Sequence, residues 1–238
     1  MKKKVMITGA GRRLGLYLSK EFYELGWTVY AITRNKNQDL LSLSEKSRRV
    51  KVIEISDYTP ESFKYILDNF ISFDVDVLIN NASIFENDLE LNVGGVEQYL
   101  KLFNIHMVIP SVLIECFQRS LCEIGKRGVV INVTDIFSEN PSSSQALYCS
   151  TKAGLESLTK SLAKKYANVM RVNSIQPGPI KFLPEHTEEE KIKVLSQTLL
   201  AMESGFYPIL QAARFIIDND YVTGTAIKVD GGRSINSW

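Results

Sequence analysis

Tyr148 and Lys152 are the two residues whose types and spacing point most directly to chemistry. They stand four positions apart, so a helix would place the phenol and the ammonium on one face, in adjacent turns. The ammonium favours the phenolate, and we expect it to lower the pKa of Tyr148 so that the hydroxyl can deliver a proton at neutral pH. Such a pair is suited to act beside a hydride donor. Because Tyr-x-x-x-Lys pairs also arise by chance, a purely structural role is the alternative.

A glycine-rich segment, Thr8-Gly9-Ala10-Gly11-Arg12-Arg13-Leu14-Gly15, follows a short apolar run and precedes a helical pattern. Glycines let the backbone approach a pyrophosphate closely, and a helix N-terminus offers unpaired N–H groups to its charge. The spacing departs from the Rossmann fingerprint, because Leu14 occupies the place of the third glycine and Gly15 follows one residue late. A glycine turn without a ligand is the alternative. The residues expected to contact a dinucleotide here are Gly9, Arg12, Arg13, Leu14 and Gly15.

The end of the second predicted strand indicates which nicotinamide cofactor is bound. An acidic residue there would bind a free ribose 2′-hydroxyl, whereas arginine suits a 2′-phosphate. This strand ends in Thr33 and Arg34, without a carboxylate. Arg12, Arg13 and Arg34 are expected to converge near the adenosine ribose, with Thr33 beside them, which favours NADPH over NADH. Glu54, at the end of the third strand, is a candidate acceptor for the adenine amino group. Ordinary exposed surface charge is the alternative for all of these charged residues.

Short β-branched runs alternate with stretches of helical period, which predicts a parallel sheet covered by helices on both faces. The seven expected strands are 4–8, 28–32, 50–55, 75–80, 128–133, 170–175 and 226–229. The expected helices run from about Leu14 to Leu25, with Gly26 as the C-terminal cap, and over 60–70, 95–122, 150–166, 188–202 and 208–217.

No repeat, linker or break in composition marks a second domain, so residues 1–238 are expected to form one α/β domain. The segment 179–202 looks least tied to the sheet and is a candidate flap over a ligand. Its three consecutive glutamates, Glu188 to Glu190, also fit the solvated first turn of a helix.

Composition excludes several classes of function. The chain has 238 residues, 45% of them hydrophobic, and 28 Lys and Arg against 27 Asp and Glu. This balance excludes the broad basic field with which proteins bind nucleic acid or a membrane surface. Cys116, Cys122 and Cys149 have no metal-type spacing, so we expect free thiols, no metal and a reducing compartment. No stretch approaches eighteen uncharged apolar residues, and the apolar run after the first lysines is too short for a signal peptide. A cytoplasmic location is expected.

Taken together and in this order, the motifs resemble the short-chain dehydrogenase/reductase family over nearly the whole chain. The resemblance implies a single Rossmann-type domain in which the tyrosine is the acid and the lysine also holds the nicotinamide ribose. It further implies that Asn81, Ala82 and Ser83 line the cofactor cleft, that Pro177 and Gly178 form a turn beside the nicotinamide, and that the chain forms a dimer or tetramer through 95–122 and 150–166. The matching residues are Thr8-Gly9, Gly15, Asn80 to Ser83, Tyr148, Lys152, Asn173, Pro177-Gly178, Thr223-Gly224 and Asp230 to Gly232.

Three departures narrow the resemblance. Arg13 replaces the middle glycine of the family loop, Asp135 replaces the usual catalytic serine thirteen residues before Tyr148, and His106 stands where the family commonly has asparagine. Together with Asn81-Ala82-Ser83-Ile84-Phe85, the first two resemble the pteridine reductase branch. For His106, a hydrogen-bonded helix histidine and a proton relay both remain open.

The branch implies a pterin slot at this site. Phe85 would sandwich the pterin against the nicotinamide, Ser83 would shape the slot, and Arg13 would bind cofactor phosphate and the acceptor edge of the pterin. Asp135 can accept hydrogen bonds from ring or exocyclic N–H groups, and its charge would keep Tyr148 protonated for donation to a ring nitrogen. A cap on a loop is the alternative for Asp135, and a place in the core is the alternative for Phe85.

The function expected from these residues is NADPH-dependent reduction of dihydromonapterin, dihydrobiopterin or dihydrofolate to the tetrahydro form. A small pterin is favoured because no pocket for a glutamate tail is evident in the sequence. The alternatives are a ketoreductase of acyl or sugar carbonyls, which the same fold would support, and a sensor that binds NADPH without chemistry.

Overall fold

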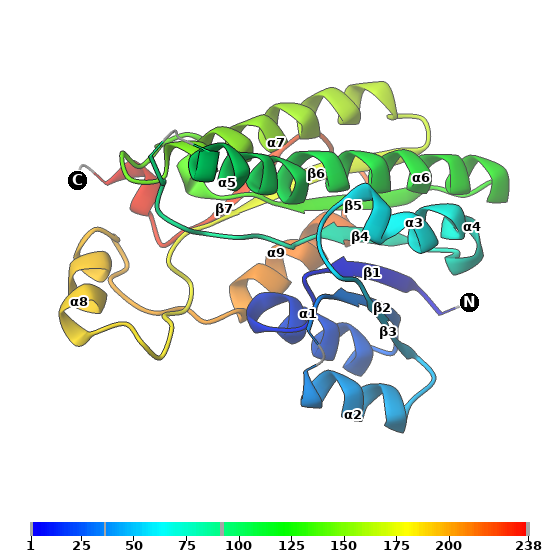
Figure 1. Cartoon of the computed structure of the whole chain (residues 1–238). Helices are drawn as coiled ribbons and strands as arrows, with labels where there is room; N and C mark the ends of the chain where they lie inside the picture. Colours follow the sequence, from blue (N-terminus) through cyan, green and yellow to red (C-terminus); the bar gives the residue numbers. More distant parts are fainter. Residues whose placement is uncertain (1, 36, 91–92, 237–238) are drawn as a thin grey trace.

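A computed structural model describes residues 2–35, 37–90 and 93–236, and within them seven parallel strands form one sheet. The strand order is β3-β2-β1-β4-β5-β6-β7 (Figure 1). Strands β2 and β3 are added on one side of β1 and strands β4 to β7 on the other, so the order of the strands reverses between β1 and β4. The predicted α/β, Rossmann-type fold is therefore confirmed. The strands are β1 (Lys4–Thr8), β2 (Thr28–Thr33), β3 (Val50–Glu54), β4 (Val77–Asn80), β5 (Gly128–Val133), β6 (Met170–Pro177) and β7 (Ala226–Val229).

Helices cover both faces of the sheet, as predicted. The longest predicted helix is divided by one π-helical turn, the helix expected over 188–202 ends at Ser196, and α2 was not predicted. The helices are α1 (Arg13–Glu24), α2 (Gln38–Lys46), α3 (Pro60–Asp68), α4 (Phe70–Phe73), α5 (Val93–Phe103), α6 (Ile109–Ile124), α7 (Ala146–Lys165), α8 (Glu188–Ser196) and α9 (Tyr207–Asp218). The π turn η1 covers Asn104–Val108, and the 3₁₀ turns η2 and η3 cover Ile136–Ser138 and Arg233–Ile235.

Two hydrophobic cores lie on opposite faces of the sheet. On one face, α3 to α7 pack through side chains such as Phe63, Phe117 and Tyr148. On the other, α1, α2 and α9 pack through side chains such as Leu18, Leu40 and Ile216 (Figure 1). Burial of apolar area on both faces explains why the strands are nearly continuous apolar runs in the sequence.

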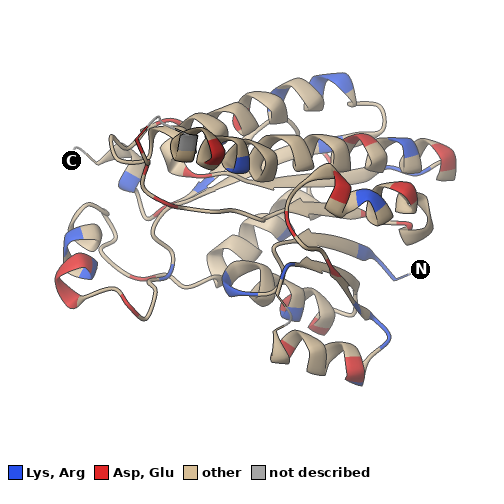
Figure 2. Ribbon diagram, in the orientation of Figure 1, with Lys and Arg blue, Asp and Glu red and all other residues tan. Residues whose placement is uncertain are grey.

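The helical run from Gly94 to Ile124 is long and apolar enough, by length and composition, to cross a membrane. In the structure it instead packs on the sheet, with Ile105, Leu113 and Phe117 buried in the core. Acidic and basic residues are interspersed over the helices of both layers (Figure 2).

The carboxyl ends of β1, β4, β5 and β6 meet at one edge of the sheet. Because each strand is followed there by a loop, residues distant in the chain are brought together at the point where the strand order reverses. The candidate site is built on these loops and on the first turns of α1 and α7.

Candidate active site

Asp135 and Tyr148 form a hydrogen-bonded pair. Asp135 follows β5 and is the N-cap of η2. Its Oδ1 accepts the N–H of Phe137 at 2.9 Å. Its Oδ2 accepts the hydroxyl of Tyr148 at 2.9 Å, and Tyr148 is buried in the first turn of α7. The alternative interpretation of Asp135 as a cap is therefore correct for Oδ1, while Oδ2 binds the phenol; its role towards a pterin stays a prediction.

The expected lowering of the Tyr148 pKa is wrong. Burial raises the pKa of Tyr148 well above 10, and the charge and hydrogen bond of Asp135 raise it further, while Ser83 acts in the opposite direction. The ammonium of Lys152 lies 5.7 Å from the centre of the Tyr148 ring, but it donates to the carbonyl oxygen of Val133 at 2.9 Å. Tyr148 is therefore held as a neutral phenol, the form that can donate a proton.

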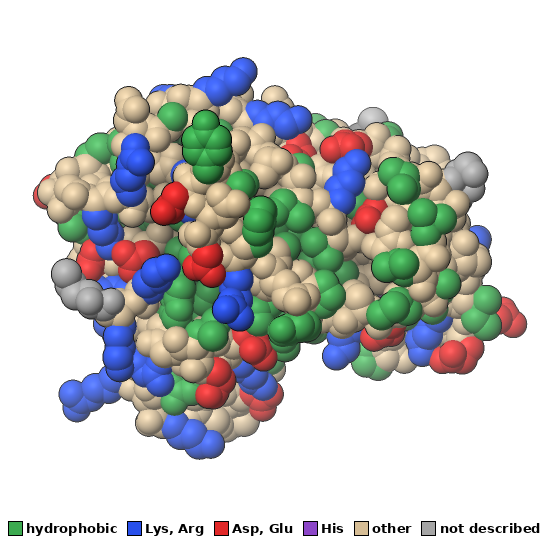
Figure 3. All heavy atoms as spheres, turned by 180° about the vertical axis from the view of Figure 1, so that it is seen from behind, with side chains coloured by type: hydrophobic (Ala, Val, Ile, Leu, Met, Phe, Trp, Pro, Cys, Tyr) green, Lys and Arg blue, Asp and Glu red, His purple; other side chains and the backbone are tan. Residues whose placement is uncertain are grey.

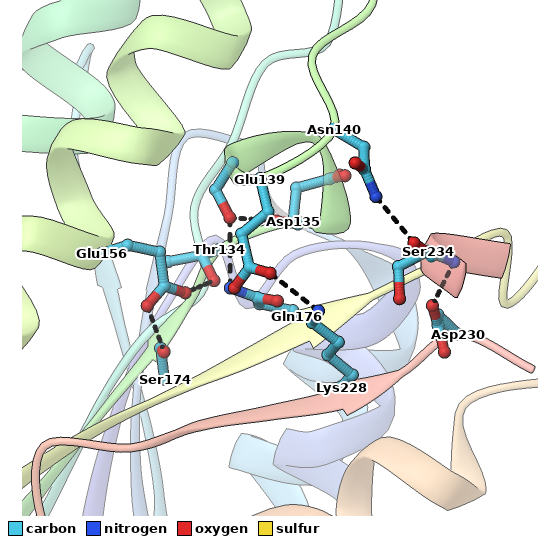
Figure 4. A network of polar contacts seen from close by, with 11 residues as sticks. Thr134, Asp135, Glu139, Asn140, Glu156, Ser174, Gln176, Lys228, Asp230 and Ser234 are labelled. Atoms are coloured by element: carbon cyan, nitrogen blue, oxygen red, sulfur yellow. Dashed lines mark hydrogen bonds and ion pairs between the residues drawn. The ribbon is translucent and has the colours of Figure 1, made fainter. Parts of the chain in front are cut away.

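Lys152 is fully buried one turn after Tyr148. Burial lowers its pKa to about 8, against the attraction of Asp135 and Glu156. Glu156 accepts hydrogen bonds from Thr134 and, at 2.8 Å, from Ser174, so its carboxylate is fixed beneath the site (Figure 4). Burial also raises the pKa of Asp135, while the N–H of Phe137 and the charge of Lys152 lower it.

Phe85 lies at the mouth of the site and is 58% exposed, so its alternative placement in the core is wrong. Its ring meets Tyr148 edge-on at 5.0 Å between centroids, and it lies nearly parallel to Phe137 at 6.3 Å. The guanidinium of Arg233 lies 5.7 Å from the centre of the Phe137 ring and is close enough to Asp135 for mutual attraction. Neither Phe137 nor Arg233 was predicted, although Phe137 follows Asp135 by two residues and Arg233 follows the Asp-Gly-Gly motif.

The loop that carries Phe85 is fastened to the start of α7. The carboxylate of Asp88 accepts the N–H groups of Ala146 at 2.6 Å and Leu147 at 3.2 Å, so it caps α7 from far away in the chain. The side-chain amide of Gln98, on α5, donates to the carbonyl oxygen of Asn87 at 2.9 Å. These contacts hold the aromatic ring and the phenol in a fixed relation.

The glycine loop packs closely on the loop after β4. Gly9 has φ +68°, and a Cβ there would lie 2.8 Å from the Cα of Ala82. A Cβ on Gly15 would run into the carbonyl oxygen of Gly9. Thr8 Oγ1 accepts the N–H groups of Asn81 and Ala82 at 3.0 Å each. The predicted cofactor residues of β1 and β4 are therefore brought together.

The three arginines of the predicted cofactor site divide into two groups. Arg34 lies 5.4 Å from the centre of the Tyr58 ring, and both Arg12 and Arg34 lower the pKa of Tyr58 against the larger raising effect of burial. Arg13, with φ +48°, instead donates from Nη2 to the carbonyl oxygen of Lys181 at 2.6 Å. Tyr58, which was not predicted, therefore lies near Arg12 and Arg34, whereas Arg13 binds the carbonyl oxygen of Lys181. The convergence of the three arginines at an adenosine ribose stays a prediction.

The remaining predicted cofactor residues border this edge of the sheet. Leu14, in the first turn of α1, is buried in the core. The N-cap of α1 is Arg12, whose side chain has no hydrogen-bond acceptor and makes no capping hydrogen bond. Thr33 donates to the carbonyl oxygen of Asn35 at 2.9 Å, and Glu54 is exposed at the end of β3. Pro177 ends β6, and the N–H of Gly178 donates to the carbonyl oxygen of Val229 at 3.0 Å.

The candidate flap, residues 179–202 and here called the flap segment, contains α8, which lies apart from the sheet (Figure 1). Thr187 and Glu190 form a capping box at its start, and the structure buries none of the residues from Glu188 to Ser196. Gln197 accepts a hydrogen bond from Arg233 at 2.7 Å. Hydrophobic side chains are exposed at this end of the molecule (Figure 3), including Ile192, Leu199, Leu200 and Met202.

Two further observations bear on the chemistry. A cavity of about 660 Å³ lies at the opposite edge of the sheet, lined by Asp76, Gly128 and Arg171 among others, and none of the predicted site residues lines it. Among the residues that the structure describes, no group of three or more His, Cys, Asp or Glu could hold a metal ion.

Comparison with known proteins agrees with this geometry. The sequence profile of the short chain dehydrogenase family matches residues 3–192. The chain belongs to the short-chain dehydrogenase family. It is accordingly an oxidoreductase, as predicted.

Individual relatives within the short-chain dehydrogenases differ in activity. A dihydromonapterin reductase of Enterobacter sp. (strain 638) is 28% identical over 237 residues, 98% of each chain. The 3-oxoacyl-[acyl-carrier-protein] reductase FabG of Haemophilus influenzae is also 28% identical, over 97% of each chain. The FolM alternative dihydrofolate reductase 1 of Brucella canis, solved with NADP, has a TM-score of 0.87 at 22% identity and covers 99% of this chain and 95% of its own. Other solved neighbours carry NAD⁺ or NADH. The expected resemblance to the pteridine reductase branch is supported.

Proposed function

We propose that the protein reduces a dihydropterin to the tetrahydro form with NADPH. The main support for this function is the hydrogen bond from Tyr148 to Asp135, which lies beside the exposed ring of Phe85. A carboxylate is a strong acceptor for the N–H edge of a pterin ring, whereas the serine usual at this position can donate to a carbonyl oxygen. Phe85 offers a flat face beside that acceptor. A dihydromonapterin reductase among the relatives supports the same substrate class.

The residues around the glycine loop fit a nicotinamide dinucleotide. The first turn of α1 offers backbone N–H groups to a pyrophosphate, and Gly9 allows close approach. Arg12 and Arg34 flank Tyr58 at the end of the sheet where a 2′-phosphate would need positive charge, which favours NADPH. Asn81, Ala82, Ser83, Pro177 and Gly178 would border the nicotinamide, and the cofactor would supply the hydride.

The protein groups then handle the proton and the orientation of the substrate. Tyr148 donates its hydroxyl proton, and Asp135 accepts an N–H of the ring and keeps the phenol protonated beforehand. Lys152 offsets the charge of Asp135 and would hold the nicotinamide ribose, as the family resemblance implies. Phe85 stacks on the ring and excludes water from one face.

A ketoreductase of acyl substrates is the second candidate, because the FabG relative is as similar in sequence as the dihydromonapterin reductase. Asp135 argues against this activity, since a carboxylate would repel the oxyanion that develops during carbonyl reduction. A substrate comparison therefore separates the two candidates.

The test is NADPH oxidation with dihydromonapterin, dihydrobiopterin, dihydrofolate and an acetoacetyl thioester in parallel, with wild type and Asp135→Ser. We expect pterin turnover by the wild type and a loss of about 100-fold in the variant, the lower range for a positioned acid–base group, with unchanged NADPH binding. Asp68→Ser, a change of the same type at an exposed helix position, should have no effect. Thioester turnover without pterin turnover, or equal loss of NADPH binding, would contradict the assignment.

We also infer a cytoplasmic homo-oligomer, a dimer or tetramer, that joins through α5, α6 and α7. The exposed side chains Tyr99, Leu100 and Phe103 of α5 support this interface, and three free cysteines suit a reducing compartment. Light scattering on wild type and Leu100→Glu should report an oligomer that dissociates in the variant, and a monomeric wild type would exclude it.

A further inference from the structure

His106 is buried between two hydroxyl groups at the edge of the candidate active site. Its Nε2 lies 2.8 Å from Ser83 Oγ, and its Nδ1 lies 2.9 Å from Thr151 Oγ1. The side chain is 1% exposed and lies in the π turn η1, between α5 and α6. Single π turns inside helices are frequent at functional sites.

The hydrogen bonds of Thr151 determine the protonation of both ring nitrogens. Thr151 Oγ1 donates to the carbonyl oxygen of Tyr148 at 2.8 Å, and a hydroxyl has only one proton to give. The Nδ1 of His106 must therefore carry a proton and donate it to Thr151. Burial and the charge of Lys152 lower the pKa of His106 well below 6.5, so the ring is neutral and its Nε2 is an acceptor. Ser83 consequently donates its hydroxyl proton to Nε2.

We propose that His106 is a positioning residue that holds the Ser83 hydroxyl proton away from the substrate slot, so that Ser83 faces a bound ring as a hydrogen-bond acceptor. The chain of contacts ends at a backbone carbonyl, so His106 orients Ser83 and does not carry protons to solvent.

This inference rests on the proposed function and deepens it by defining which groups the substrate must present. With Ser83 fixed as an acceptor and Asp135 as a second one, Tyr148 is the donor of the three. A flat ring with several N–H groups matches two acceptors and one donor, whereas a simple ketone, which has only acceptor lone pairs, matches one group of the three. His106 thus contributes to specificity without touching the substrate.

Nitrogen NMR of the imidazole rings tests the assignment directly in the wild-type protein. The chain has two histidines, so a His186→Gln variant identifies the signals of His106. We expect a protonated Nδ1 and an unprotonated Nε2 that do not change between pH 5.5 and 8. A protonated Nε2, or a doubly protonated ring, would overturn the proposal. The measurement needs no substrate, so its outcome is independent of whether the pterin assignment holds.

A kinetic test uses Thr151→Val, which removes the acceptor of Nδ1 while keeping the side-chain shape. The imidazole can then shift its proton to Nε2 and turn Ser83 into a donor, so the KM for the pterin should rise about five- to tenfold, the range of one neutral hydrogen bond, with kcat nearly unchanged. Ser83→Ala should give a similar rise, and the double variant should add little to it. Additive effects, or a fall in kcat alone, would show that His106 does not act through Ser83.

Discussion

The catalytic wall, formed by β5, η2 and α7, and the flap segment are held by different kinds of contact. In the wall, Asp135 and Tyr148 are joined by a partly buried hydrogen bond, and Asp135 and Lys152 are also bound to the backbone. In the flap segment, the described residues of α8 bury no side chain, and the helix is stabilised by its own capping box. Buried polar networks position atoms for chemistry, whereas weakly packed segments open at low free-energy cost. The two regions therefore differ in how firmly their side chains are held in the folded state.

The loop after β5 also binds the C-terminal segment that meets the flap segment. Glu139 pairs with Lys228 at 2.7 Å, and Asn140 donates to the carbonyl oxygen of Ser234 at 2.8 Å (Figure 4). Arg233, the neighbour of Ser234, then reaches Gln197. The catalytic wall and the flap segment therefore both contact η3. A substitution of Gln197, the partner of Arg233 in the flap segment, tests whether the two regions act separately.

The largest expected effect comes from removing the phenol of the catalytic wall. Tyr148→Phe should lower kcat by about 10² to 10⁴-fold, because the proton donor is lost, while the ring contacts with Phe85 and His106 are retained. NADPH binding and the melting temperature should stay near those of the wild type. Steady-state kinetics with calorimetry check this, and a retained kcat would exclude Tyr148 as the acid.

The second effect is a pH dependence of activity that comes from the charge of Lys152, whose neighbours are Asp135 and Glu156. We expect kcat/KM to fall as pH rises through about 8, because neutral Lys152 no longer offsets the charge of Asp135. Stability should respond in the opposite direction. The folded-state pKa lies below the unfolded value of 10.5, so the unfolded state binds more protons between them, and this group makes the free energy of unfolding rise with pH from about 8 to 10.5.

Measuring activity and urea denaturation over the same pH range separates these two slopes. Loss of activity while the protein keeps or gains stability supports loss of charge at Lys152. Loss of activity that follows unfolding would assign the pH limit to the fold and not to the site.

A smaller effect is expected where the flap segment meets the wall. Gln197→Ala removes the acceptor of Arg233, so the KM for the pterin should rise a few-fold, in line with one partly buried hydrogen bond to a charged group, while kcat changes little. Gln118→Ala, on the exposed side of α6, is the matched control. A fall in kcat as large as that of Tyr148→Phe would mean that the flap segment and the wall are one unit.

The same contrast explains which features the sequence could predict. The strands were placed within about two residues of their observed ends, because strands buried on both faces are unbroken apolar runs. α2 was missed because it buries only Leu40, so its apolar pattern is weak. The predicted direction of the Tyr148 pKa shift was wrong, because the spacing reveals the neighbour Lys152 but does not reveal the burial of the phenol. Arg233 was missed because the fold brings it to Asp135 from nearly a hundred residues away.

The smallest effect is expected when a helix cap is removed. Removing one cap from α8 and one from α7 should show whether each helix unfolds locally or with the whole chain. Thr187→Ala removes the cap of α8 and should cost about 1 kcal/mol, but only locally, since α8 buries no side chain. Hydrogen exchange of α8 amides should accelerate about fivefold with an unchanged melting temperature. Asp88→Ala removes a cap of α7 instead, and because α7 belongs to the core, this change should lower the melting temperature of the whole chain. Equal shifts in the two variants would mean that the flap segment unfolds together with the core and is not an independent cover.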